Sequence, residues 1–333
     1  MELVSIVITT YNGYEKLGRA IDSVLAQTYP NIEIIVVDDN ARGTEERYLT
    51  EKVMEFYQDD NIIYLKHDVN RNGAVARNTG IKSANGKYIT FLDDDDYIVE
   101  NRVEEAVIQL KKNSASIFLC SVCVVRKKNG IKIIHIPAKI SVKDILLNEN
   151  IIGTGSNLFL EMDVVNAVYG FDEAFIRYQD REFLLRICEV GKVCTLDKIQ
   201  VIKSENKQNN IPDFYVMKKV EDRFIAKFST EFDALNSQEK KRYELNKMHM
   251  LFKLVLDTGD VKEIKEEYGS IKSQKDLHWY EVISYFLAKL NVINLMQIKH
   301  RIMPFMAKVK NIKFSLEIRK HKELWKFIKD KER

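Results

Sequence analysis

Short runs of β-branched and apolar residues alternate with segments of helical spacing over the first hundred residues, and this alternation constrains the fold more than any other feature. The runs cover residues 4–8, 32–37, 62–65 and 88–92. Between the first two runs, Leu17, Ile21 and Val24 recur at helical spacing. Strands separated by single helices are typical of parallel sheets that helices cover on both faces. We therefore predict an α/β fold with a Rossmann-like, mixed and mostly parallel sheet.

The strand pattern weakens after residue 100 and ends near residue 211. Beyond that point the chain is rich in Lys, Glu, Leu, Ile and Phe, which favours helices. The polar stretch 203–212 is the best candidate for a linker. We predict an α/β domain over residues 1–205, with halves 1–100 and 101–205, and a mostly helical C-terminal region over residues 206–333.

The composition is that of an ordinary globular protein. Of the 333 residues, 45% are hydrophobic and 30% are charged, and the 13 Gly and 4 Pro argue against low-complexity or collagen-like segments. No run of about 18 uncharged apolar residues is present, and the first residues lack a basic region. We therefore expect neither a transmembrane helix nor a signal peptide, and a cytoplasmic location is the default expectation.

The cysteines and histidines predict no metal or redox site. Cys120 and Cys123 have the spacing of a Cys-x-x-Cys motif, but residues 117–125 read as a buried strand. Positions i and i+3 of a strand point to opposite faces, so we expect buried structural cysteines. The six histidines form no ligand-spaced pair, and we assign them no function.

Polar residues follow three of the predicted strands. Residues 9–12 follow the first strand, residues 38–40 the second, and four consecutive aspartates, residues 93–96, the fourth. In an open α/β sheet, ligands bind outside the carboxyl ends of the strands. Four adjacent carboxylates repel one another and need a cation, and hard oxygen ligands select Mg²⁺ or Mn²⁺. An acidic turn in solvent is the alternative, but the preceding strand and the two other clusters favour a metal site.

In their order and spacing, seven segments resemble family-2 glycosyltransferases of the GT-A fold, of the type that builds bacterial cell envelopes and capsular polysaccharides. The segments are residues 4–12, 23–29, 33–40, 70–81, 86–96, 170–173 and 179–186. The resemblance covers about residues 1–200 and implies a nucleotide-binding half over residues 1–100 and an acceptor half over residues 101–205.

The resemblance implies a set of nucleotide-binding residues. Thr9, Tyr11 and Asp39 would hold the base, with the Tyr11 ring available for stacking and the Asp39 carboxylate accepting from the uracil imide. The remaining nucleotide-binding residues would be Asn12, Arg77, Asp93 and Asp94. An ion pair of Arg77 with Asp38 or Asp39 is a nearly equal alternative to nucleotide contact.

The resemblance also implies a metal ligand and a catalytic base. Asp93 and Asp95 match the Asp-x-Asp motif of the family, in which the second aspartate binds the Mn²⁺ or Mg²⁺ cofactor. Asp180 matches the catalytic base, although Gln179 stands where relatives commonly have Glu. The chain also lacks the histidine that many relatives carry after Ile202, where it has Lys203 and Ser204. Residues 153–157 would form a floor for donor sugar or acceptor, or an ordinary turn.

These residues predict a metal-dependent inverting transferase. It would move a sugar from a UDP-sugar to an acceptor hydroxyl, on a glycan or a lipid-linked sugar, in surface polysaccharide, glycolipid or glycoprotein glycan assembly. The alternative is a catalytically silent module that binds sugar nucleotide or glycan within an envelope assembly complex. A nucleotidyltransferase would open with a Gly-rich loop, and the loop here has only Gly13. We expect no nucleic-acid partner.

The last 35 residues are strongly basic, although the net charge of the chain is only +3. Residues 299–333 contain 12 Lys and Arg against 4 Asp and Glu, interleaved with bulky apolar residues and Trp325. A basic segment of this kind is what a helix at an anionic membrane surface needs. The enzyme would then lie on the inner face of the cell membrane. Packing on the preceding helices or homo-oligomer formation is the alternative.

Overall fold

The structure is a computed structural model of the 333-residue chain. It describes residues 1–126, 130–148, 151–204, 212–258 and 260–274, together with residues 281, 282, 285 and 328. The chain divides into two compact units, the first formed by Met1–Lys207 with Glu317–Arg333 and the second by Gln208–Leu316. The domain boundary predicted at residue 205 stays a prediction, because residues 205–211 lie outside the described residues.

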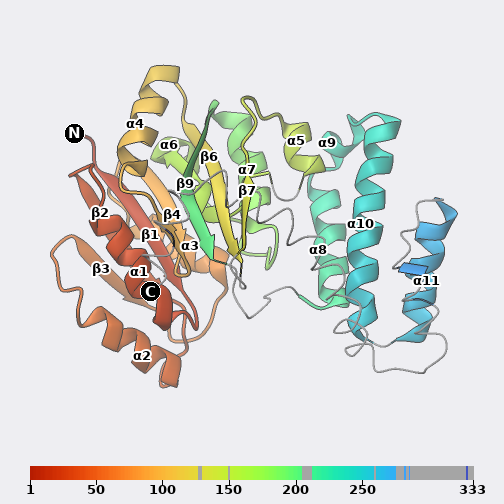
Figure 1. The fold of residues 1–333 in the computed structure, drawn as a ribbon, viewed down its shortest axis with the longest axis horizontal. Coiled ribbons are helices and arrows are strands. Elements are labelled where there is room, and N and C mark those ends of the chain that lie inside the picture. Colours follow the sequence, from red (N-terminus) through yellow and green to blue (C-terminus); the bar gives the residue numbers. More distant parts are fainter. Residues whose placement is uncertain are drawn as a thin grey trace. The chain divides into compact units, whose positions relative to one another are not determined.

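The first unit alternates strands and helices as the sequence predicts (Figure 1). Its N-terminal elements are β1 (Val4–Thr10), α1 (Tyr14–Leu25), β2 (Ile32–Asp38), α2 (Glu45–Met54), β3 (Ile62–Lys66), α3 (Gly73–Ser83), β4 (Tyr88–Asp93), β5 (Asp96–Ile98) and α4 (Arg102–Asn113). The later elements are β6 (Ile117–Arg126), β7 (Gly130–Ile134), α5 (Val142–Leu147), the 3₁₀ turn η1 (Gly155–Asn157), β8 (Phe159–Glu161), α6 (Met162–Ala167), α7 (Gln179–Val190) and β9 (Val193–Ser204).

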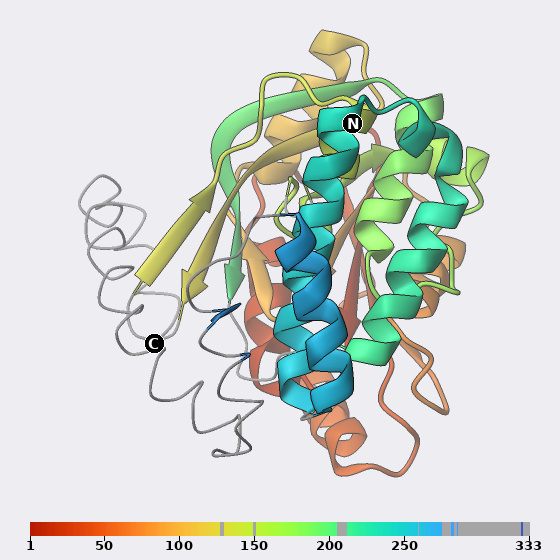
Figure 2. The ribbon, with the colours of Figure 1, turned by 90° about the vertical axis from the view of Figure 1, so that its right-hand side faces the viewer.

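Within the described residues, these strands form one mixed sheet in the order β3-β2-β1-β4-β8-β6-β9-β5, with β7 paired to β6. The pairings among β1 to β4 are all parallel, whereas β8 joins β4 and β6 as an antiparallel strand. Figure 2 shows β6 and β9 as long curved strands, which pair in parallel. The predicted mixed α/β fold is confirmed.

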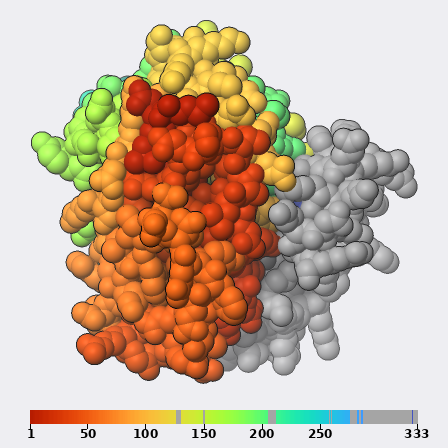
Figure 3. Space-filling model, turned by 90° about the vertical axis from the view of Figure 1, so that its left-hand side faces the viewer, coloured from red at the N-terminus to blue at the C-terminus, as the bar shows by residue number. Residues whose placement is uncertain are grey.

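Successive side chains along β1 point to opposite faces of the sheet. Ile6 and Ile8 lie in a core cluster with Leu17 and Ile21 of α1, and the same cluster includes Val103 of α4. The surface of this N-terminal part of the chain (red to orange) forms one continuous face in Figure 3.

On the opposite face, a Cβ on Gly80 of α3 would lie 2.2 Å from Val7 Cγ1, so glycine lets this helix pack closely on β1. Phe91 of β4 contacts Phe171 and Phe183, with ring centroids 5.1 and 6.4 Å apart. Helices therefore cover both faces, as expected.

The two strand cysteines confirm the structural assignment. Cys120 lies in the large core cluster, and Cys123 lies in a second cluster with Tyr97, Ile131 and Ile202. Burial raises the pKa of the Cys123 thiol to about 12, so it stays protonated at neutral pH. Ile328, the one described residue of the basic tail, is buried in this second cluster. The other residues of the predicted membrane-binding tail lie outside the described residues.

The second unit is helical over the residues that the structure describes. Its helices are α8 (Phe214–Lys227), α9 (Ser229–Asp233), α10 (Ser237–Thr258) and α11 (Val261–Ser273). Phe214, Phe252 and Tyr268 belong to its core cluster, which confirms a helical C-terminal region with an aromatic core. No helix in the described parts of the chain is both long and apolar enough to cross a bilayer.

Candidate active site

The three polar clusters meet at one edge of the sheet. Thr10 pairs with Asp38 of β2, and Thr9 pairs with Asp93 of β4, so the ends of β1, β2 and β4 lie side by side. These are the carboxyl ends of three parallel strands, where the sequence analysis places the ligand site. The predicted convergence is therefore present.

Asp94 closes the loop after β1 instead of joining the other aspartates. Its Oδ2 atom accepts from the Tyr11 backbone N–H at 3.2 Å, and its own N–H donates to Thr9 O at 3.2 Å. A Cβ on Gly13 would lie 1.8 Å from Asp94 Oδ2, so a side chain at position 13 would displace the Asp94 carboxylate from this contact. Asn12 has φ 56° and donates its N–H to Asn40 Oδ1 at 2.9 Å. The loop leaves Tyr11 52% exposed, which is the exposure that a stacking ring needs.

Asp39 is held by three donors that the sequence analysis did not assign. His67 Nδ1 lies 2.6 Å from Asp39 Oδ1, and the Arg71 N–H donates to the same oxygen at 2.9 Å. Asn70 Nδ2 donates to Oδ2 at 2.8 Å. Thr79 Oγ1 lies 2.9 Å from His67 Nε2 and completes the contacts of the ring. The carboxylate is therefore fixed in orientation, and His67, to which we assigned no function, belongs to the site.

The neighbouring Asp38 has a structural role. It is fully buried, pairs with Arg47 at 2.8 Å and accepts from the Tyr64 hydroxyl at 2.6 Å. Such a buried carboxylate with several donors fixes the end of β2 and the loop that carries Asp39.

Arg77 forms neither of the ion pairs that the sequence analysis weighed for it. Its guanidinium pairs with Asp93 Oδ1 at 2.6 Å and donates to Gln179 Oε1 at 3.0 Å. The alternative pairing with Asp38 or Asp39 is wrong, because Arg47 and His67 occupy those carboxylates. Arg77 instead links the end of β4 to the start of α7.

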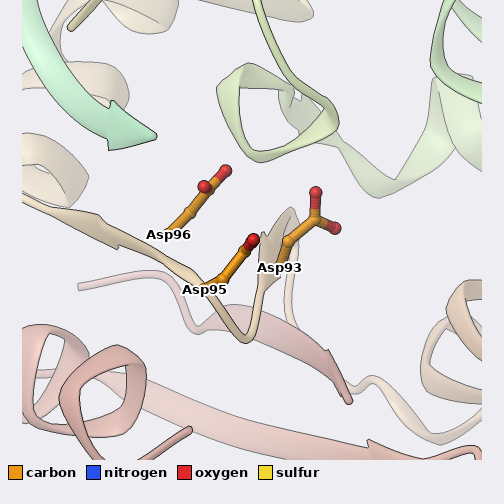
Figure 4. A group of neighbouring side chains, drawn as sticks. All are labelled: Asp93, Asp95 and Asp96. Atoms are coloured by element: carbon orange, nitrogen blue, oxygen red, sulfur yellow. The ribbon is translucent and has the colours of Figure 1, made fainter. Parts of the chain in front are cut away.

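Asp93, Asp95 and Asp96 form the acidic cluster of the site. Each offers a carboxylate oxygen within 4.8 Å of the others, and Figure 4 shows the three side chains on the same side of the β4–β5 connection. Asp96 Oδ2 accepts from Thr154 Oγ1 at 2.9 Å and from Ser156 Oγ at 2.7 Å. The turn over residues 153–157 therefore lies directly against the cluster.

Burial and mutual repulsion perturb the pKa values of these aspartates. Burial, followed by the charges of neighbouring aspartates, raises the pKa of Asp95 to about 7 and that of Asp96 to about 8. Burial also acts on Asp93, but the charges of Arg77 and Lys203 outweigh it and lower the pKa. Without a further cation, Asp95 and Asp96 therefore hold protons near neutral pH.

The cluster fits a hard divalent cation. Its donors are carboxylate oxygens, which Mg²⁺ and Mn²⁺ prefer. Among the described residues, the buried Asp96 Oδ1 atom has no hydrogen-bond partner, which leaves one oxygen of the cluster unsatisfied. Asp95, the predicted ligand, lies within this group together with Asp93 and Asp96.

Asp180 lies beside the same cluster. It is the second residue of α7, and the Arg181 N–H donates to its Oδ1 atom at 3.0 Å. A Cβ on Gly155 would lie 3.7 Å from Asp180 Cβ and 3.6 Å from Arg77 Nη2. The structure therefore brings the predicted base, Arg77 and the turn below the acidic cluster together. The charge of Lys203, which follows Ile202 where relatives carry the histidine, also interacts with this group, and the sequence analysis gave Lys203 no role.

These pKa values predict a pH-dependent stabilisation by Mn²⁺. The raised carboxyl pKa values make the folded protein bind more protons than the unfolded chain between about pH 4 and pH 8. The free energy of unfolding of the metal-free protein therefore falls as the pH rises through this range. At about pH 6, Mn²⁺ must displace these protons to bind, whereas at about pH 8 most of them are already gone. The increase in melting temperature caused by Mn²⁺ should therefore be larger at about pH 8 than at about pH 6.

Thermal melts at both pH values test this expectation. Asp95→Asn should abolish most of the Mn²⁺-induced shift, and Asp60→Asn, an exposed aspartate in a loop of the same unit, is the matched control. An equal shift at both pH values, or a full shift in Asp95→Asn, would contradict the assignment of the cluster.

Comparison with known proteins relates this site to a family. Residues 5–169 match the family described as Glycosyl transferase family 2. An uncharacterized glycosyltransferase of Rickettsia bellii is 35% identical over 210 residues, which are 61% of this chain and 29% of that protein. The Escherichia coli protein WfgD, named UDP-Glc:alpha-D-GlcNAc-diphosphoundecaprenol beta-1,3-glucosyltransferase, is 34% identical over 146 residues, which are 44% of this chain and 56% of WfgD. The chain thus spans 29% and 56% of the lengths of these two relatives.

Solved structures show the same fold. TarS of Staphylococcus aureus, residues 1–349 in complex with UDP-GlcNAc, superposes with a TM-score of 0.58 at 15% identity, covering 86% of this chain and 79% of that one. The identity is low, so this likeness concerns the fold, which is GT-A-like. By their sequence match, residues 5–169 of the chain belong to glycosyl transferase family 2.

Proposed function

We propose that this chain is a metal-dependent inverting glycosyltransferase, which moves a sugar from a UDP-sugar to an acceptor hydroxyl. The observation that carries the proposal is the position of Asp180 beside the acidic cluster at the carboxyl edge of the parallel strands. A base and a divalent-cation site at one edge, next to a loop with an exposed tyrosine, are the parts that such a transfer needs.

The names of related proteins support a UDP-sugar donor and a lipid-linked acceptor. WfgD is named for UDP-Glc and for a GlcNAc-diphosphoundecaprenol, and a second E. coli relative, WfaP, carries the same activity name at 40% identity over 107 residues. We infer a role in the assembly of surface polysaccharide, glycolipid or glycoprotein glycan.

The nucleotide would lie over the loop after β1. We place the base against the exposed Tyr11 ring, with Asp39 accepting from the uracil imide N–H. Three residues hold that carboxylate in one orientation: His67, Asn70 and Arg71. Nucleotide binding therefore costs little conformational entropy at this side chain. Thr9 and Asn12 would shape the same pocket, and Asp94 would act through the loop that it closes.

The transfer would be a single in-line displacement. Asp180 takes the proton of the acceptor hydroxyl as its oxygen attacks the anomeric carbon, and the bond from that carbon to the UDP oxygen breaks. Asp95, with Asp93 and Asp96, would hold Mn²⁺ or Mg²⁺, which neutralises negative charge on the departing UDP when bound. Arg77 holds Asp93 and Gln179 together, and this contact fixes the end of β4 relative to the start of α7.

The alternative, a silent sugar-nucleotide or glycan-binding module, would need neither an acidic cluster nor a base. Burying several like charges costs free energy, and a binding module gains nothing from that cost. The presence of Asp95, Asp96 and Asp180 in one site therefore supports catalysis.

Asp180→Asn should separate catalysis from binding. The variant cannot accept a proton, so transfer should fall by about 10²–10⁴-fold, while UDP affinity and melting temperature stay close to wild type. Asp163→Asn is the matched control, because Asp163 also lies in the first turn of a helix, α6, but is exposed.

Donor and acceptor must be identified first. Hydrolysis of UDP-Glc, UDP-Gal, UDP-GlcNAc and UDP-GalNAc with Mn²⁺ would identify the donor. Transfer by Asp180→Asn within a few-fold of wild type would show that Asp180 is not the base.

We further propose that the basic tail contacts an anionic membrane surface, where a lipid-linked acceptor would be found. Each Lys or Arg near such a surface contributes about 1 kcal/mol. Replacing Lys308, Lys310 and Lys313 by Gln in the full chain should reduce flotation with anionic liposomes. The same change at the exposed Lys262, Lys265 and Lys272 of α11 is the control. If the full chain does not float with anionic liposomes at low salt, this proposal is wrong.

A further inference from the structure

Lys203 is a positive charge that the mechanism above does not use. It is the second-last residue of β9 and pairs across the sheet with Asp96 of β5 in antiparallel register. Its Nζ atom donates to Gly153 O at 3.4 Å, on the turn that supports the acidic cluster. The strand pairing and the turn thus place this side chain at the cluster.

The charge of Lys203 interacts with four carboxylates, those of Asp96, Asp93, Asp180 and Asp95. Burial alone would lower the pKa of Lys203, but these carboxylates outweigh it and raise the pKa. The ammonium is therefore charged at neutral pH. Three of these carboxylates, those of Asp93, Asp95 and Asp96, belong to the candidate metal site, and the other, Asp180, is the candidate base.

Lys203 is not committed to any one of these carboxylates. Within the described part of the chain it forms no ion pair shorter than 4.0 Å, whereas Arg77 contacts Asp93 at 2.6 Å. Arg19 is also engaged, because it donates to Asp95 O and Ser204 Oγ and lies over the Tyr97 ring. A charged amine that faces several carboxylates without a direct pair remains available to an anionic ligand.

We propose that the Lys203 ammonium binds the diphosphate of the donor nucleotide and that the same charge weakens the binding of a divalent cation to the nucleotide-free site. An ammonium is a compact point charge that binds phosphate without a fixed geometry. Its repulsion opposes a second cation on the same carboxylates, and the diphosphate compensates that repulsion. This inference rests on the proposed function, since it requires a nucleotide at this edge of the sheet.

The proposal predicts two effects of opposite sign for Lys203→Met. Without nucleotide, the variant should bind Mn²⁺ at least about tenfold more tightly than wild type, because a repulsive charge is gone. It should bind UDP at least about tenfold more weakly, while its affinity for uridine, which has no phosphate, stays unchanged. Lys203→Arg keeps the charge and should stay within a few-fold of wild type in both measurements.

Mn²⁺ affinity is read from the electron paramagnetic resonance signal of free Mn²⁺, and nucleotide affinity from calorimetry at fixed Mn²⁺. Lys87→Met is the matched control, because Lys87 lies next to β4 of the same unit but is paired at the surface with Glu2. Thermal melts check folding, and Lys203→Gln replaces the Met variant if that variant does not fold.

The outcomes separate this proposal from the proposed function. If wild type binds neither uridine nor UDP, the proposed function is wrong, and the diphosphate role of Lys203 falls with it. If wild type binds both and Lys203→Met weakens them equally or not at all, only the assignment of Lys203 is wrong. If Lys203→Met binds Mn²⁺ no more tightly than wild type in the absence of nucleotide, the claim that the Lys203 charge weakens cation binding is wrong.

Discussion

The balance of charge after β4 is the constraint on which the rest of the site depends. Four consecutive aspartates cannot all be ionised side by side in a buried place, so each needs its own arrangement. Asp94 turns to the loop after β1, and Asp93 is paired with Arg77. Burial still raises the pKa of Asp94 to about 7. Asp95 and Asp96 also keep raised pKa values, and Asp96 has one unsatisfied oxygen. The proposed divalent cation would neutralise this remainder.

The surrounding residues follow from that balance. Asp94 occupies the space that a side chain at Gly13 would fill. The contact of Asp94 with Tyr11 shapes the loop that exposes the Tyr11 ring. Thr154 and Ser156 donate to Asp96 and so tie the turn before β8 to the cluster. Arg77 connects Asp93 to Gln179, the residue before the candidate base. The nucleotide, metal and acceptor parts of the proposed site therefore share one network of polar contacts.

Local patterns were sufficient to predict β1 to β4, the helices between them and the edge at which the polar clusters meet. The rule that ligands bind at the carboxyl ends of parallel strands depends only on the order of strands and helices, so it could be applied to the sequence. The partners of each charge could not be predicted in this way. His67 contacts Asp39 from 28 residues away, and Lys203 reaches the cluster through the pairing of β5 with β9. Neither contact leaves a spacing in the sequence. The pairing of Arg77 with Asp93 was missed for the same reason, since the sequence analysis weighed nucleotide contact against an ion pair with Asp38 or Asp39.

The family match ends at residue 169, whereas Asp180 and Lys203 lie beyond it. The test of the central claim must therefore show that both parts of the chain bind one ligand. We suggest anomalous diffraction at the manganese edge from crystals of the full chain soaked with MnCl₂ and UDP. The account predicts a single strong peak within about 2.0–2.3 Å of carboxylate oxygens of Asp95 and its neighbours, with the diphosphate of UDP next to it and the uracil over Tyr11. A manganese peak away from Asp93, Asp95 and Asp96, or UDP bound elsewhere, would contradict it.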